Sequence, residues 1–148
     1  ILTLFVNPEG AKRFWTQIDL SDLYQFNQSR YVTLTSIMII IAVLKAMMFY
    51  FIVKIFYDKK VEFSKPFNET LNRFVFKTAY LALGIGLFSF LGAKFSRQLS
   101  QQGVQLPDTQ QLQMGGADVW LFMGVTLLVI AFIFKKGVEI QNENDLTV

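Results

Sequence analysis

Three long apolar runs separated by polar stretches constrain the fold of this chain more than any other feature of its sequence. They lie at about 37–57, 74–93 and 119–134. A helix as long as the first run rises about 31 Å, which matches a bilayer hydrocarbon core of about 30 Å. None of the runs alternates apolar and polar residues with a period of two, as strands would. The sequence therefore predicts an all-α, polytopic bundle of transmembrane helices.

The composition agrees with a membrane protein and disfavours an enzyme. Apolar residues make up 53% of the chain and charged residues only 17%, which is little for a soluble surface. Cysteine and histidine are both absent, and no Asp or Glu lies within the three runs. We therefore expect no catalytic site, metal or cofactor. The net charge of +3 is too mild to indicate direct nucleic-acid binding.

The N-terminal region allows two interpretations. Residues 1–6 are apolar and stop at Asn7-Pro8, where a helix would end. They are either the end of a truncated fourth transmembrane helix, which we favour, or a short interfacial segment. Residues 7–33 mix aromatic and acidic side chains, and they form either an amphipathic segment on the membrane or a loop that packs on the helix ends. We expect one membrane domain over 1–148.

The basic residues predict how the helices are oriented. One side of the membrane would carry eight of them: Lys54, Lys59, Lys60, Lys65, Arg73, Lys77, Lys135 and Lys136. The other side would carry five over a longer stretch: Lys12, Arg13, Arg30, Lys94 and Arg97. The positive-inside rule then places 58–73 and 135–148 in the cytoplasm, and 7–33 and the glutamine-rich, solvated 94–118 outside it.

Lys45 is a candidate intramembrane polar site because it lies near the middle of the first run. A cation at that depth is costly unless it is paired, hydrated or extended toward the headgroups. Candidate partners are the hydroxyl groups of Ser36, Thr78, Tyr80, Ser89 and Thr126, backbone carbonyls, or Asp118 if the third helix begins deep. A contact inside the bundle, an outward-reaching lysine and a substrate or ion path all remain open.

Other residues point to packing, capping and anchoring. Ala82 and Gly86 have the spacing of small residues that lets helices approach closely. Asn68 is placed to cap the second spanning helix, with Glu69 in the first turn. Lys54 and Lys77 are expected within about one turn of their helix ends, where lysines extend to the interface.

The C-terminal stretch changes from basic to acidic and is a candidate cytoplasmic docking segment. Its charged residues are Lys135, Lys136, Glu139, Glu143 and Asp145. The alternative is a solvated extension of the third helix that binds nothing.

Four short stretches resemble the bacterial family called domain of unknown function 2975. They are IFKKGVEIQNENDLTV at 133–148, IDLSDL at 18–23, LKA at 44–46 and PFN at 66–68. The resemblance implies a small inner-membrane protein of four helices, often encoded beside small helix-turn-helix regulators. It implies no activity, cofactor or catalytic residue.

Taken together, these patterns favour a non-enzymatic sensor, scaffold or regulatory membrane subunit. The expected partners are the lipid bilayer, a cytoplasmic regulator, and further copies of the chain or other membrane subunits. The alternative is a small transporter or channel subunit that uses Lys45 in an anion or lipid path.

Overall fold

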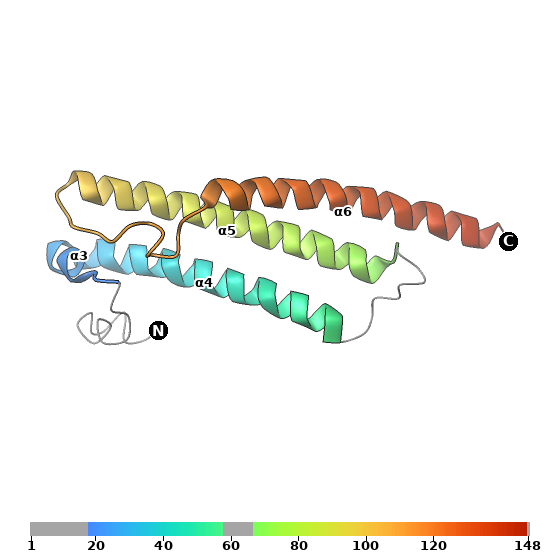
Figure 1. Ribbon diagram of the computed structural model, residues 1–148, viewed down its shortest axis with the longest axis horizontal. Helices are drawn as coiled ribbons and strands as arrows, with labels where there is room; N and C mark the ends of the chain where they lie inside the picture. The colour runs from blue at the N-terminus through green and yellow to red at the C-terminus, as the bar shows by residue number, and fades with distance from the viewer. Residues whose placement is uncertain (1–17, 58–66, 148) are drawn as a thin grey trace. The chain divides into compact units, whose positions relative to one another are not determined.

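The computed structural model describes residues 18–57 and 67–147. It contains a short helix and three long ones (Figure 1): α3 (Ser21–Phe26), α4 (Gln28–Tyr57), α5 (Glu69–Gln101) and α6 (Ala117–Leu146). No strand occurs among the described residues, so the all-α prediction is confirmed. The expected helix end at 1–6 lies outside the described residues.

Helices α4, α5 and α6 are each long and apolar enough to cross a membrane. They have 30, 33 and 30 residues and contain the three apolar runs. At 1.5 Å per residue they measure about 45 to 50 Å, more than the hydrocarbon core of about 30 Å. Each helix therefore tilts or projects beyond the core. The bilayer boundaries within the helices stay a prediction.

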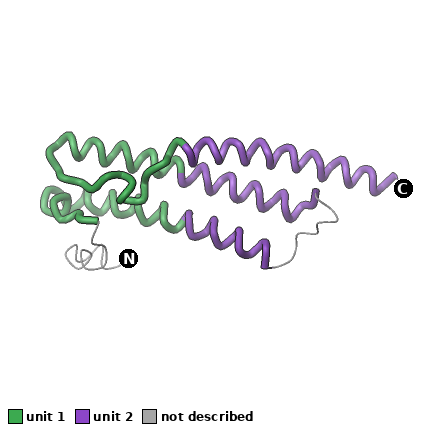
Figure 2. The backbone as a smooth tube through the Cα atoms, viewed as in Figure 1, with its two compact units in different colours: residues 1–43, 86–118 green, residues 44–85, 119–148 purple. Residues whose placement is uncertain are grey.

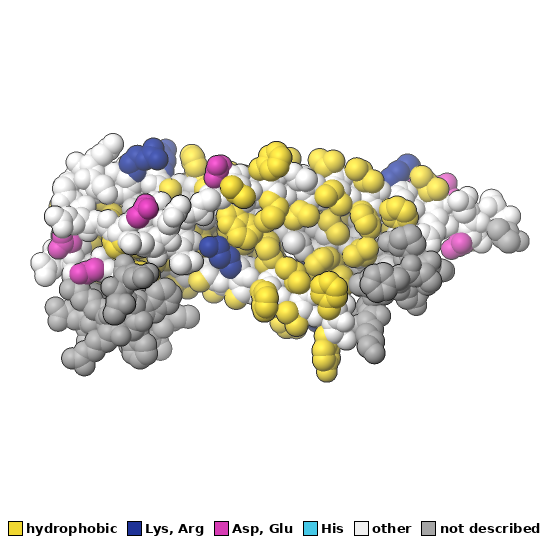
Figure 3. All heavy atoms as spheres, in the orientation of Figure 1, with side chains coloured by type: hydrophobic (Ala, Val, Ile, Leu, Met, Phe, Trp, Pro, Cys, Tyr) yellow, Lys and Arg dark blue, Asp and Glu magenta, His cyan; other side chains and the backbone are white. Residues whose placement is uncertain are grey.

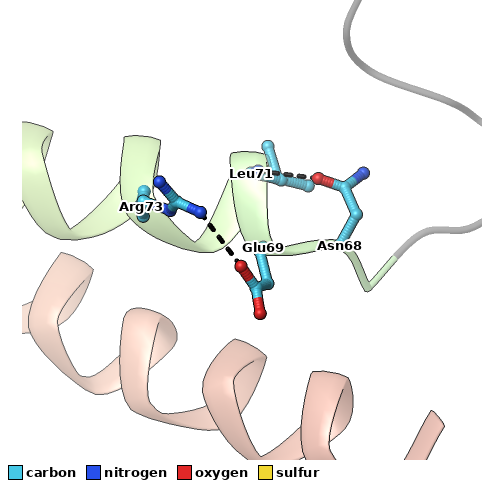
Figure 4. Close-up of polar contacts among 4 residues, drawn as sticks. All are labelled: Asn68, Glu69, Leu71 and Arg73. Carbon is cyan, nitrogen blue, oxygen red and sulfur yellow. Dashed lines mark hydrogen bonds and ion pairs between the residues drawn. The ribbon is translucent and has the colours of Figure 1, made fainter. Parts of the chain in front are cut away.

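The start of α5 follows from local side-chain chemistry. The Asn68 side-chain oxygen Oδ1 accepts a hydrogen bond from the backbone N–H of Leu71 at 2.7 Å, which confirms the predicted cap (Figure 4). Glu69 lies in the first turn and pairs with Arg73 at 3.0 Å. Both of these side chains are largely exposed, so the pair contributes little stability, about 0.3 to 0.5 kcal/mol. The cap and the apolar run explain why the helix begins here.

The contacts divide the chain into two compact units, drawn in different colours in Figure 2. The first comprises residues 1–43 and 86–118, and the second 44–85 and 119–148. The core of the first unit includes Leu23, Leu34 and Leu112, all fully buried.

The connection after α5 corrects one expectation. Residues 94–118 were expected to form a solvated loop, but α5 continues through Gln101. In the loop that follows, Val104, Leu112 and Met114 are buried. The apolar residues spaced among the glutamines pack inward, which the glutamine content of this stretch concealed.

The described part of the polar-aromatic stretch favours the packing interpretation. Ile18, Leu20 and Leu23 are buried within the first unit. The ring of Tyr24 also lies edge-on to that of Tyr31, with centroids 5.2 Å apart. These apolar side chains contribute to the core of the unit and do not face outward along one side of a helix.

In the second unit, two glycines at helix contacts differ in the space around them. A Cβ added to Gly84 of α5 would meet Leu44 of α4 at 3.5 Å, an ordinary contact. One added to Gly124 of α6 would lie 2.7 Å from the Leu83 side chain and 2.9 Å from its backbone nitrogen. Backbone cannot move aside cheaply, so the α5–α6 contact of this unit requires a glycine at 124.

The outer surface of the second unit is apolar. Figure 3 shows hydrophobic side chains gathered over its helices on the drawn face. Phe49, Phe56 and Phe122 are 69%, 74% and 77% exposed. Large exposed apolar surfaces mark contact with lipid or protein, and here they cover helices that can cross a membrane.

We predict that Gly124→Ala destabilises the protein by about 1 to 3 kcal/mol, because the new methyl group overpacks the contact with Leu83. Gly84→Ala is the matched control, since its methyl group has room beside Leu44 and alanine favours a helix. Denaturant titration in detergent measures both. Equal stability of the two variants would show that Gly124 does not set this contact.

Candidate functional site

Lys45 lies on an aromatic ring. Its ammonium nitrogen Nζ is 5.9 Å from the ring centroid of Trp120, the two residues coming from α4 and α6 of the second unit. Both residues are partly buried. The face of an indole ring carries negative charge density, which attracts a cation by about 0.5 to 2 kcal/mol. The contact compensates part of the cost of keeping the lysine partly buried.

Two of the hydroxyl groups proposed as partners of Lys45 also bond within their own helices. The hydroxyls of Thr78 and Thr126 each donate to a carbonyl of their own helix, those of Phe74 and Phe122, at 2.9 Å. The indole of Trp120 was not among the predicted partners of Lys45. A tryptophan near the start of the third apolar run was the signal that could have revealed it.

A second feature is a pocket of about 280 Å³ formed by α4 and α5 in the second unit, called here the basic pocket. Its lining residues are Lys54, Arg73, Lys77, Thr70, Phe51, Ile55 and Phe74. Three cations from two helices thus share one cavity with a hydroxyl group and three apolar side chains. Such a lining favours the binding of an anionic group that is covalently attached to an apolar group.

The bounds of α4 and α5 confirm the predicted position of Lys54 and correct that of Lys77. Lys54 lies in the last turn of α4, as expected. Lys77 does not lie within one turn of a helix end, because α5 already begins at Glu69. Its Nζ is 5.4 Å from the Phe51 ring centroid, and Lys54 Nζ is 5.6 Å from that of Tyr50. That the two lysines line one pocket was not predicted, because the sequence does not show which faces of α4 and α5 meet.

The expected helix-packing residues are both buried. Ala82 is fully inaccessible and Gly86 is buried. Their role in helix association stays a prediction. Gly124 and Gly137 were missed because each is an isolated glycine on α6. Gly137 lies against the ring of Phe67, which also packs on Phe134 at 5.3 Å between centroids.

The C-terminal charges all lie on α6, which continues to Leu146. Every one of the five is exposed: Lys135, Lys136, Glu139, Glu143 and Asp145. Lys136 pairs with Glu139 at 3.2 Å. Their expected role in docking stays a prediction.

A second pocket of about 270 Å³ lies in the first unit and includes Asp19, Ser21 and Asp22. The Asp19 carboxylate accepts hydrogen bonds from the backbone N–H and the hydroxyl of Ser21, at 3.0 and 2.6 Å. This carboxylate stabilises the first turn of α3. Among the residues that the structure describes, no group of three acidic side chains is placed to hold a metal ion.

Comparison with known proteins gives one match. The sequence pattern of the family described as "Protein of unknown function (DUF2975)" matches residues 6–148. No curated protein and no solved structure matches the chain. The family match covers all four stretches that carried the resemblance and confirms it.

We predict that Lys45 and Trp120 are energetically coupled by about 1 kcal/mol. Lys45→Met and Trp120→Leu should together destabilise the protein by less than the sum of their separate effects, because either one removes the same contact. A double-mutant cycle of unfolding in detergent measures this coupling. Phe122→Leu, at a largely exposed ring of the same helix, is the control and should be additive with Lys45→Met. If the effects of Lys45→Met and Trp120→Leu on stability are also additive, the two side chains do not interact as proposed.

Proposed function

The chain belongs to the DUF2975 family, and on that premise we propose that it is a non-enzymatic scaffold or sensor of the bacterial inner membrane. In this proposal it docks a cytoplasmic regulator on the exposed end of α6, called here the acidic rod (residues 137–146). The continuity of α6 from its apolar part into this charged end carries the proposal.

The acidic rod is joined to a membrane-crossing helix without a break. At about 45 Å, α6 exceeds the hydrocarbon core by about 15 Å, or some ten residues. Its apolar part ends at Phe134, so the excess falls on the charged end. A movement of the helix in the membrane would therefore reach the rod directly.

The base of the acidic rod is held in place by packing. Val138 is buried, and Gly137 lies against Phe67 at the start of α5. Beyond this contact, Glu139 and Glu143 are four residues apart and share one face of the helix. An exposed acidic face on a fixed helix suits a partner with a basic surface.

The distribution of basic residues supports the predicted orientation of the helices in the membrane. The side predicted to be cytoplasmic carries the larger number of basic residues, including Lys135 and Lys136 at the exit of α6. In this arrangement the acidic rod lies in the cytoplasm, where a regulator can reach it.

The alternative, a transporter subunit that uses Lys45, stays a prediction. Lys45 lies on the Trp120 ring, a contact that also suits a purely structural role. Lys45→Met separates the possibilities, since a path residue would abolish flux without loss of the folded protein.

We predict that Glu139→Gln, Glu143→Gln and Asp145→Asn together abolish docking, because they remove the negative charge of the rod and keep its helix. The matched control neutralises three exposed acids elsewhere: Asp22, Asp108 and Asp118. A partner that crosslinks to the parent protein in membranes is first identified and purified. It is then titrated against the parent protein, the rod variant and the control variant. At least a tenfold loss of affinity in the rod variant alone is expected. An equal loss of affinity in the two variants, or no loss in either, would contradict the proposal.

A further inference from the structure

The basic pocket contains more positive charge than its internal contacts neutralise. The Arg73 guanidinium has five N–H donors, and its ion pair with Glu69 is exposed to solvent. Lys54 and Lys77 lie on the rings of Tyr50 and Phe51, which attract a cation without occupying its N–H groups as an acceptor would. Within the described residues 18–57 and 67–147, donors from α4 and α5 thus remain for an anionic ligand.

The three cations lie near the ends of the apolar runs of α4 and α5, where the predicted bilayer boundary places lipid headgroups. Lys54 lies in the last turn of α4, where the apolar part of that helix ends. Arg73 is in the second turn of α5, and Lys77 lies one turn further along. Lysine and arginine at the ends of apolar helices meet the phosphates of the adjacent leaflet.

The apolar lining indicates what the anion is attached to. Phe51, Ile55 and Phe74 form walls of the same cavity. On α4 the neighbouring Val53 and Phe56 are 49% and 74% exposed. A free phosphate ion would gain nothing from these apolar surfaces, whereas acyl chains would cover them.

We propose that the basic pocket binds the headgroup phosphate of an anionic phospholipid. Arg73 and Lys77 contact the phosphate oxygens from α5, and Lys54 contacts them from α4. Phe51, Ile55 and Phe74 contact the upper part of the acyl chains. The bound lipid links α4 to α5 in the second unit, and this assignment is independent of docking on the acidic rod.

The test compares three ligands on the protein purified in a neutral detergent. Phosphatidylglycerol, phosphatidylcholine and the soluble glycerol phosphate are titrated separately, and native mass spectrometry measures the bound fraction. We expect phosphatidylglycerol to bind at least tenfold more tightly than the other two. Equal binding of phosphatidylcholine would overturn the requirement for an anionic lipid. Equal binding of glycerol phosphate would show a site for free phosphate esters and overturn the lipid assignment.

Variants locate the site. Arg73→Gln with Lys77→Gln should weaken phosphatidylglycerol binding about 25-fold, at about fivefold per cation near the headgroup. Lys94→Gln with Arg97→Gln is the matched control, because it removes one lysine and one arginine from exposed positions at the other end of α5. The control should keep parental affinity within about twofold, since a distant surface charge is screened.

Lys54→Gln provides an independent test from α4. It should weaken phosphatidylglycerol binding about fivefold even if the double variant does not fold. Parental affinity in Lys54→Gln, or an equal loss in the pocket and control double variants, would overturn the assignment.

Discussion

The backbone hydrogen bonds of α4, α5 and α6 are the constraint on which the rest of the structure depends. In hydrocarbon no water can satisfy a backbone N–H or C=O, so a crossing segment must satisfy these groups internally. Helices of 30, 33 and 30 residues do this and leave mainly apolar side chains facing outward. Polar side chains within them then need local solutions. The hydroxyls of Thr78 and Thr126 donate to their own helices, and Lys45 lies on an indole ring.

Because lipid is as apolar as the helices, burial of apolar surface does little to hold membrane helices together, and close packing matters more. In the second unit Gly124 lets α6 approach the backbone of α5 at Leu83, where no Cβ would fit. The ends of the apolar helices then provide two surfaces of opposite character. The basic pocket suits an anionic lipid, and the acidic rod suits a basic protein partner. A membrane protein with both surfaces can couple its lipid surroundings to a bound regulator without catalysing a reaction.

The sequence predicted those features that depend on local composition. Four such features were predicted from the sequence alone: the helical class, the three apolar runs, the Asn68 cap and the family. The contact between Lys45 and Trp120 was not, because it joins residues from two helices whose relative rotation depends on packing. The basic pocket was missed for the same reason. The buried residues of 104–114 were missed because apolar side chains at irregular spacing among glutamines carry no periodic signal.

If α4, α5 and α6 cross the membrane, the loop before α6 and the acidic rod lie on opposite sides of it. The chain contains no cysteine, so single introduced cysteines can be labelled without background. In intact cells an impermeant maleimide should label Gln110→Cys in the loop. It should label Asn142→Cys in the rod only after permeabilisation, and Val129→Cys within α6 should stay protected in both conditions. Labelling of the loop and rod cysteines from the same side of the membrane would contradict the account.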